Sequence, residues 1–356
     1  MTKTAIIISP NWGTYAEKYL EDLLVSFVAQ RYSGELKFFL VDNETSEASR
    51  ALVNGICTKI LAGFDWMLLT NVDNAGFAKG NNVAMQQAID EGYDYLALFN
   101  MDGLVAPDCL TKAIATLEQD EQIGAVQPRL MLWPDTERIN SLGNVTHFLG
   151  FGYCEGNGEL WQAEQENLKN IAYPSGAAVV FRASALVKVG LFDEKFWMYN
   201  EDQDLGWRLW LAGYRCVSAL DAVFYHKYQF AKSIKHFYWQ DRNRLLAVLK
   251  NYNFLTILVL LPAYLVSELG LWLTAIRGGW FTSRLKVYGY FLLPTTWFYL
   301  LGARGKSQKL RRVTDKEIIK LFSGKILYQE LDSPIVKVGN LLLNTYWQIV
   351  KRLITW

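Results

Sequence analysis

The stretch YLALFNMDG, residues 95–103, decides the fold class, because a short apolar run ends there in polar residues. A continuous apolar run such as Tyr95–Phe99 is typical of a strand buried on both faces of a parallel sheet. Ligands of such sheets bind beyond the carboxyl ends of the strands, so Asn100 and Asp102 are predicted to lie at a ligand-binding edge. The alternative is a plain turn, because Asn, Asp and Gly all favour turns.

The chain upstream repeats this pattern with three further apolar runs, Ala5–Ser9, Leu36–Val41 and Trp66–Thr70. Between the first two runs, apolar residues follow helical spacing: Leu20, Leu23, Leu24, Phe27 and Val28. Strands that alternate with helices predict an α/β fold whose mostly parallel sheet is covered by helices on both faces. Downstream, residues 131–172 are predicted as loops with at most one pair of strands, and Ala177–Phe181 forms another apolar run.

Three carboxylates, Glu201, Asp202 and Asp204, lie within four residues among large apolar side chains. Apolar surroundings raise the pKa of a carboxylate, and a carboxylate with a raised pKa can act as a general base near neutral pH. The alternative is an acidic first turn of a helix, which the helix dipole favours. The residue types alone leave both interpretations open.

The net charge of +1 comes from 36 Lys and Arg against 35 Asp and Glu among 356 residues, which argues against a dedicated nucleic-acid-binding protein. The charge is divided unevenly. Residues 1–226 hold 16 basic and 29 acidic residues, a net charge of −13, whereas residues 227–356 hold 20 and 6, a net charge of +14. We therefore predict two domains, a catalytic one at 1–226 and a basic, helical, membrane-associating region at 227–356.

The four cysteines lie far apart, without a CxxC pair, and are predicted to be reduced thiols rather than zinc ligands.

The basic region contains two long apolar runs, at 254–276 and 287–303. The first is long enough to span a hydrocarbon core of about 30 Å and the second is marginal. The connecting residues Arg277, Arg284 and Lys286 oppose a spanning hairpin, so helices in the membrane plane or re-entrant helices are expected. A true hairpin and a soluble core remain open. Five basic residues that follow the second run would attract anionic lipid: Arg304, Lys306, Lys309, Arg311 and Arg312. An apolar stripe along Ile335–Trp356 predicts an amphipathic helix.

Six motifs occur in a fixed order along residues 4–230. They are a strand ending in Asn11, then Val41-Asp42-Asn43, the loop at Asn74–Asn82, Leu98–Asp102, Ser175-Gly176-Ala177, and Gly190–Leu205. Taken together, they resemble the inverting glycosyltransferases of family 2, which have the GT-A nucleotide-sugar fold. Within that family the chain looks most like the rhamnosyltransferase branch, which builds bacterial surface polysaccharides such as O-antigen.

The resemblance implies a role for each motif. The nucleotide of the donor would be held by Pro10, Asn11, Asp42, Asn74, Gly76, Gly80 and Asn81. Asp102 would bind Mn2+ or Mg2+ as cofactor, with Asn100 and His226, although a lone histidine can also be structural. Many relatives have Asp where this chain has Asn100, which suggests weaker metal affinity.

On the acceptor side, the resemblance implies that Asp202 is the base and that Glu201 supports it. The acceptor would be bound by Trp197, Tyr199, Ser175 and Gly176, although the two aromatic residues could equally belong to the core. Lys235, Arg242 and Arg244 could grip a lipid diphosphate or could form a solvated helix face.

The expected protein is a membrane-associated transferase at the cytoplasmic face. Its partners would be a nucleotide-sugar donor, a polyprenyl-diphosphate-linked saccharide acceptor and a membrane surface with anionic lipid. Two other functions stay open. A nucleotidyltransferase is disfavoured because no Gly-rich loop with Arg follows the first strand, and Asn100 leaves room for a non-catalytic scaffold.

Overall fold

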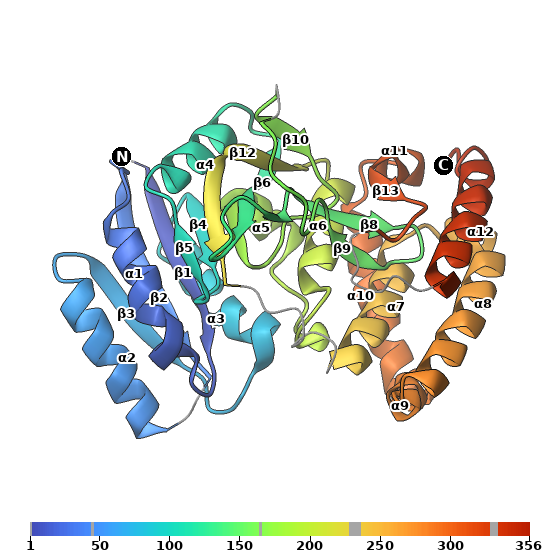
Figure 1. Cartoon of the computed structure of the whole chain (residues 1–356), viewed down its shortest axis with the longest axis horizontal. Helices are drawn as coiled ribbons and strands as arrows, with labels where there is room; N and C mark the ends of the chain where they lie inside the picture. Colours follow the sequence, from blue (N-terminus) through green and yellow to red (C-terminus); the bar gives the residue numbers. More distant parts are fainter. Residues whose placement is uncertain (1, 44–45, 164–165, 228–235, 328–333) are drawn as a thin grey trace.

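The computed structural model of the chain describes residues 2–43, 46–163, 166–227, 236–327 and 334–356, and it describes side chains for all of these except 334–336. A large sheet lies between two layers of helices, and further helices of the C-terminal region pack beside it (Figure 1). The predicted α/β class with a C-terminal helical region is therefore confirmed.

The four predicted runs form adjacent parallel strands in the order β4-β1-β2-β3. Their bounds are β1 (Lys3–Asn11), β2 (Glu35–Asp42), β3 (Asp65–Thr70) and β4 (Tyr95–Phe99). Because parallel strands end at the same edge, Asn11, Asp42 and the residues after β4 are brought together there.

The sheet then changes direction, which the sequence pattern did not predict. The strand β11 (Ala178–Arg182) runs antiparallel between β4 and β6 (Ile123–Leu132), and β6 pairs in parallel with β12 (Arg215–His226). Short strands complete this sheet, namely β5 (Gly103–Val105), β7 (Ile139–Ser141) and β10 (Leu168–Asn170). The full order along the main path is β10-β12-β6-β11-β4-β1-β2-β3.

Helices cover both faces because side chains alternate along each strand. On one face, Ile6 and Ile8 of β1 pack against η1 (Ala16–Leu20), α1 (Glu21–Val28), α2 (Glu47–Ile60) and α4 (Cys109–Glu118). On the other face, Ala5 and Ile7 pack against α3 (Gly76–Asp90), α5 (Ala183–Val189) and α6 (Glu201–Leu211). The predicted helical stripe is buried except for Val28, which is 43% exposed.

Residues 131–172 hold more structure than predicted. The strands β8 (Asn144–His147) and β9 (Gly152–Cys154) form a second, small sheet with β13 (Phe322–Ser323) from the C-terminal region. A third apolar cluster, which includes Phe148, Leu149 and Trp207, joins this part to the C-terminal helices. The two predicted domains are therefore packed on each other.

The C-terminal region is built from α7 (Phe237–Asn251), α8 (Phe254–Arg277), α9 (Phe281–Leu292), α10 (Pro294–Leu310), α11 (Asp315–Ile318) and α12 (Pro334–Val350). The second apolar run is divided between two helices, because Leu293 leaves the helical conformation and Pro294 starts α10. Within the described part of the chain, α8 is the one helix long and apolar enough to cross a membrane.

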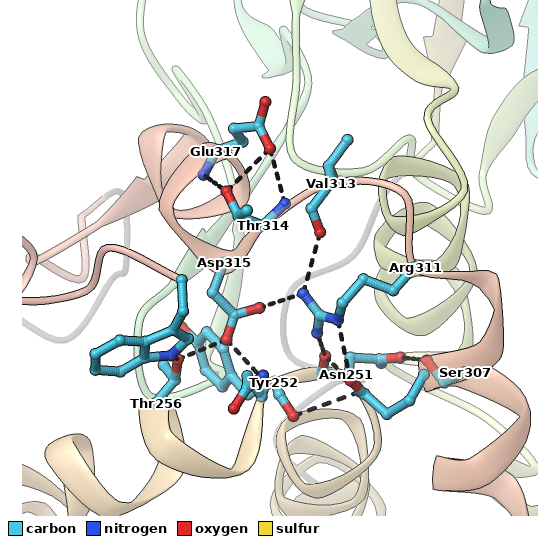
Figure 2. A network of polar contacts seen from close by, with 12 residues as sticks. Asn251, Tyr252, Thr256, Ser307, Arg311, Val313, Thr314, Asp315 and Glu317 are labelled. Atoms are coloured by element: carbon cyan, nitrogen blue, oxygen red, sulfur yellow. Dashed lines mark hydrogen bonds and ion pairs between the residues drawn. The ribbon is translucent and has the colours of Figure 1, made fainter.

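The junction of these helices is a polar network centred on Asp315 (Figure 2). Its carboxylate accepts from the backbone N–H of Asn253 at 2.8 Å and the hydroxyl of Thr256 at 2.6 Å, and pairs with Arg311 at 2.7 Å. Arg311 and Arg304 also donate to backbone carbonyls at the end of α7. Two of the five residues of the predicted lipid-binding cluster therefore have structural partners. Lys306, Lys309 and Arg312 remain exposed.

Candidate active site

The donor side of the site is a buried polar group at the ends of β1 and β2. The Nδ2 atom of Asn11 donates to Asp42 Oδ1 at 3.0 Å and to Ser49 Oγ at 2.8 Å, and Asn11 Oδ1 accepts from the N–H of Ala16. Asn11 and Asp42 are each 1% exposed. The two predicted residues are thus held in one fixed orientation.

The predicted nucleotide loop begins α3, and its glycines allow close approach. A Cβ on Gly76, which has φ +73°, would collide with Trp197, and one on Gly80 would lie 2.5 Å from the Pro10 ring. Asn74 accepts from the N–H of Gly76 at 3.1 Å. The fully buried Asn81 donates to the carbonyl oxygen of Phe77 at 2.9 Å. Gly80 therefore packs closely on Pro10, whereas the buried Oδ1 of Asn81 has no hydrogen-bond partner among the described residues.

The metal side lies where β12 meets the residues after β4. The Nε2 atom of His226 is 3.3 Å from Asp102 Oδ1, and its Nδ1 is 2.9 Å from Asn140 Oδ1. If Nδ1 carries the proton that Asn140 accepts, Nε2 presents a lone pair toward a carboxylate oxygen. An oxygen and an imidazole nitrogen facing each other at this distance suit one divalent cation with ligand distances of about 2.1 Å.

Other contacts hold these ligands. Tyr15 donates to Asp102 Oδ2 at 3.4 Å. Asn100 donates through its backbone N–H to Ala177, and its buried Oδ1 has no hydrogen-bond partner among the described residues. The same described residues contain no group of three or more His, Cys, Asp and Glu side chains that could hold a metal. A cation here would therefore depend on Asp102, His226, the amide oxygen of Asn100 and the donor's own oxygens.

The base side lies at the start of α6. Asp202 accepts from the backbone N–H of Gly176 at 3.1 Å and of Gln203 at 2.8 Å. Burial raises the pKa of Asp202 to about 6. The pKa of Glu201 is raised well above its ordinary value by burial and by the neighbouring Asp202 charge. Ionisation of one of these neighbouring carboxyls opposes ionisation of the other, so the two titrate as a coupled pair.

The third carboxylate has a different environment. Asp204 is fully buried, with Arg208 Nε, Lys250 Nζ and Asn251 Nδ2 each at 2.9 Å. Burial opposes its ionisation, but Lys250 and Arg208 hold the pKa of Asp204 at about 2. Asp204 is therefore a permanent anion that joins α6 to α7, away from the chemistry.

The predicted parts converge. A Cβ on Gly176 would contact the Phe77 ring at 3.1 Å and Asp202 Cβ at 3.9 Å. The backbone of this glycine therefore lies between Phe77 of the donor loop and the predicted base. Ser175 donates through its N–H to Gln127 at 2.7 Å. Trp197 stacks on Trp239 with ring centroids 4.7 Å apart, so this ring already has an aromatic partner.

Some predicted residues have other surroundings than expected, and others were missed. Arg242 and Arg244 are 5% and 1% exposed and have protein partners, so they form neither a diphosphate grip nor a solvated face. Lys235 lies outside the described residues. Sequence reasoning missed Tyr15 and Asn140, because they reach the site by tertiary contacts that leave no periodic signal.

The comparisons with known proteins identify the family and the fold of the chain. The sequence model of glycosyl transferase family group 2 matches residues 96–303, more than half of the chain. The chain belongs to this family. The match also runs across the predicted boundary at residue 226.

Two curated relatives extend the likeness. An N-acetylglucosaminyl-diphospho-decaprenol L-rhamnosyltransferase of Mycobacterium tuberculosis is 30% identical over 146 residues, which are 38% of this chain and 47% of the relative. The low-salt glycan biosynthesis hexosyltransferase Agl10 of Haloferax volcanii is 21% identical over 182 residues, 50% of this chain and 54% of the relative. The chain thus spans about half the length of the curated relatives that it matches.

Solved structures show the same fold. GalNAc-T7, crystallised with UDP, GalNAc and Mn2+, has a TM-score of 0.54 at 14% identity, covering 70% of this chain and 48% of its own. S. aureus TarS 1-349 in complex with UDP has a TM-score of 0.51 at 15% identity, covering 99% and 90%. The chain therefore has the fold of these glycosyltransferases, and the recognised resemblance to the GT-A fold and to rhamnosyltransferases is confirmed.

Proposed function

We propose that this glycosyltransferase is a metal-dependent inverting enzyme. It moves a hexosyl group from a nucleotide sugar to a polyprenyl-diphosphate-linked saccharide during cell-surface polysaccharide synthesis. Rhamnose is the favoured sugar because of the mycobacterial relative's name. One observation carries the proposal: the partly exposed Asp202 lies beside the donor loop, from which only Gly176 separates it. Burial raises the pKa of this carboxyl to about 6.

The base role follows from the surroundings of Asp202. An ionised carboxylate at pH 7 can accept the proton of the acceptor hydroxyl as the new bond forms. The N–H groups of Gly176 and Gln203 hold the carboxylate in place, and burial and the Asp202 charge raise the pKa of Glu201 beside it. The acceptor oxygen then attacks the anomeric carbon on the face opposite the leaving diphosphate, and a single displacement inverts the configuration.

The cofactor would be Mn2+ or Mg2+, held by Asp102 and His226 with Asn100 beside them. When bound, the ion stabilises the negative charge that develops on the leaving diphosphate. Asn140 fixes the orientation of the His226 ring, and Tyr15 that of the Asp102 carboxylate. Asn11 and Asp42 would contact the nucleoside, and Asn74 would shape the loop over the phosphates.

A donor panel tests this function. The protein is incubated with dTDP-, UDP- and GDP-sugars and a lipid extract, with and without a chelator. We expect transfer of one donor's sugar to lipid, loss of transfer with the chelator, and a product of opposite anomeric configuration by NMR. A retained configuration would overturn the inverting mechanism, and no transfer from any donor would overturn the proposal.

We also propose that residues 227–356 hold the catalytic part on a bilayer, at its cytoplasmic face. Along α8, large apolar residues face outward over the full length of the helix: Phe254, Leu258, Leu261, Leu265, Leu269, Leu273 and Ile276. Four residues of the apolar stripe predicted for residues 335–356 also face outward: Val338, Leu342, Ile349 and Leu353. Long rows of exposed apolar residues mark interaction surfaces. The relative's name, which contains diphospho-decaprenol, favours lipid as the partner of this surface.

The packing of α8 favours a helix in the membrane plane. Its other side contacts the rest of the protein along its length, through Thr256 on Asp315, Tyr264 on the carbonyl oxygen of Leu149, and Glu268 on Arg244 at 2.6 Å. A helix that crossed the bilayer could not keep these contacts and also be surrounded by lipid. We therefore infer a one-leaflet attachment by α8 and α12.

A further inference from the structure

The loop before α6 has a backbone that requires outside support. Trp197, Tyr199 and Asn200 have φ values of 63°, 67° and 63°. L-residues adopt this left-handed region rarely, and Trp and Tyr lack the short polar side chain that lets Asn tolerate it. Such a backbone persists only where the surrounding structure determines it.

That support comes from Asn243 on α7. Its Nδ2 donates to the carbonyl oxygens of Phe196, Met198 and Tyr199 at 2.8, 2.8 and 2.7 Å. An amide nitrogen carries two hydrogens, so one of them is shared between two carbonyls. Asn243 is fully buried, and water does not compete for these bonds.

Arg242 reinforces the same loop. Its Nη2 donates to the carbonyl oxygens of Lys195 at 2.5 Å and Phe196 at 3.1 Å, and its Nε donates to Asn243 Oδ1 at 2.9 Å. Its guanidinium also lies 4.3 Å from the ring centroid of Trp239, the ring on which Trp197 stacks. Backbone and side chain of the loop are thus held from one helix.

The opposite side of the loop reaches both halves of the site. The carbonyl oxygen of Trp197 accepts from the N–H of Ala78 in the donor loop at 3.0 Å. Asp202 follows Asn200 by two residues and accepts from Gly176. A shift of the loop would therefore move the base relative to the donor.

We propose that Arg242 and Asn243 are positioning residues, which fix the loop at 196–200 and thereby place Asp202 against the bound donor. This inference rests on the proposed function of Asp202 as base. Neither side chain needs to touch a substrate, because both act through the loop.

The variant Asn243→Asp tests it, since it keeps the shape and removes the donors to the three carbonyls. A misplacement of about 1 Å costs on the order of 100-fold in rate, so we expect kcat to fall by about that factor. The Kd for the nucleoside diphosphate should stay within about threefold, because the contacts of Asn11 and Asp42 are untouched.

The matched control is Asn251→Asp, the same substitution on the same helix. Asn251 is also fully buried, but it donates to Asp204 instead of the loop. We expect it to lower Tm while kcat per folded molecule stays at the wild-type value. Wild-type kcat in Asn243→Asp, or an equal loss of kcat in both variants, would overturn the proposal.

Two further measurements keep the test decisive. Arg242→Lys keeps the charge but loses the forked contact, and it should also lower kcat. This variant replaces Asn243→Asp in the test if Asn243→Asp does not fold. Amide hydrogen exchange at residues 197–203 should be faster in Asn243→Asp than in Asn251→Asp. This readout needs no transfer reaction, so it separates failure of the positioning role from failure of the proposed function.

Discussion

Asp202 and Asp204 lie two residues apart on one helix, yet their surroundings shift their pKa values in opposite directions. Burial raises the pKa of Asp202 to about 6, and no described residue provides a cationic partner for it. Asp204 is buried too, but Lys250 and Arg208 hold its pKa at about 2. Three carboxylates in one acidic segment thus divide into a base, a neighbour with a raised pKa and a structural anion.

The first prediction concerns the base itself. Asp202→Asn removes the proton acceptor and should lower kcat by about 10²- to 10⁴-fold, while the Kd for the nucleoside diphosphate is unchanged. Transfer kinetics and calorimetric titration with nucleotide measure the two quantities. Asp65→Asn, at an exposed carboxylate on β3, is the control and should leave both unaltered. Transfer by Asp202→Asn at the wild-type rate would refute the base assignment.

The pH profile gives the second prediction. Asp202 must be ionised to accept a proton, so kcat should fall as the pH decreases through about 6 and level off above it. Burial raises the pKa of both carboxyls, and it still raises that of Asp202 when a neutral amide replaces Glu201. Glu201→Gln should therefore keep the midpoint near 6. A kcat that does not change between pH 5 and 8 would contradict this picture.

A third prediction addresses the orientation of the histidine ring. Asn140→Leu removes the partner of His226 Nδ1, and losing such a partner of a metal ligand typically costs about 10- to 100-fold in metal affinity. Titration of activity with Mn2+ should show a higher requirement, and calorimetry should show weaker binding of the ion. An unchanged requirement would refute the role of Asn140 in orienting a metal-bound His226.

At the scale of elements, Asp204 joins α6 to α7. Asp204→Asn leaves Arg208 buried without its carboxylate and leaves Lys250 with Asp193 alone, which should lower the free energy of unfolding by about 3–5 kcal/mol. The folded-state pKa is depressed, so the stability from ionised Asp204 is present above about pH 4 and is lost as the pH falls toward 2. Urea unfolding of both proteins at pH 7 and pH 3 measures this. A difference that does not shrink at pH 3 would contradict the linkage.

The elements divide into those that local pattern could predict and those that it could not. The strands β1 to β4 were predicted because each contains a continuous apolar run followed by polar residues. The antiparallel insertion of β11 was not, because a buried run looks the same in either direction. The division of the second apolar run at Leu293 was also missed, although Pro294 gave a signal.

The site shows the same limit. The order of motifs placed Asp102, Asp202 and the donor loop in one region, and the structure brings them to one edge of the sheet. Asn140 and Asn243 contribute through contacts 86 and 44–47 residues away in the chain. Single polar residues with distant partners carry no local pattern, so only the folded chain identifies them.

At the scale of the whole molecule, the charge and the exposed apolar surface lie in the same third of the chain. The net charge of +14 in residues 227–356 remains partly available at the surface, since Lys306, Lys309 and Arg312 are exposed. Each basic residue near an anionic bilayer contributes about 1 kcal/mol to its attraction. Apolar burial and charge attraction would then both favour binding to the bilayer. An apolar helix inside a soluble core would need no basic surface beside it.

The last prediction tests this surface through α8. Leu261, Leu265 and Leu269 are 47%, 59% and 67% exposed, so their joint replacement by Glu should leave the fold intact. Full burial of a Leu side chain is worth about 1.5–3 kcal/mol, and the triple variant should lose most of its binding to anionic liposomes in flotation. Replacing the exposed Leu52, Val72 and Val187 of the catalytic part by Glu is the control and should leave flotation unchanged. Because an in-plane helix lies in one leaflet, cysteines placed at the two ends of α8 should both be labelled from the same side of the membrane. If the α8 variant floats with liposomes like the wild type, the bilayer contact is refuted. If opposite ends of α8 are labelled from opposite sides of the membrane, the helix spans the bilayer and does not lie in its plane.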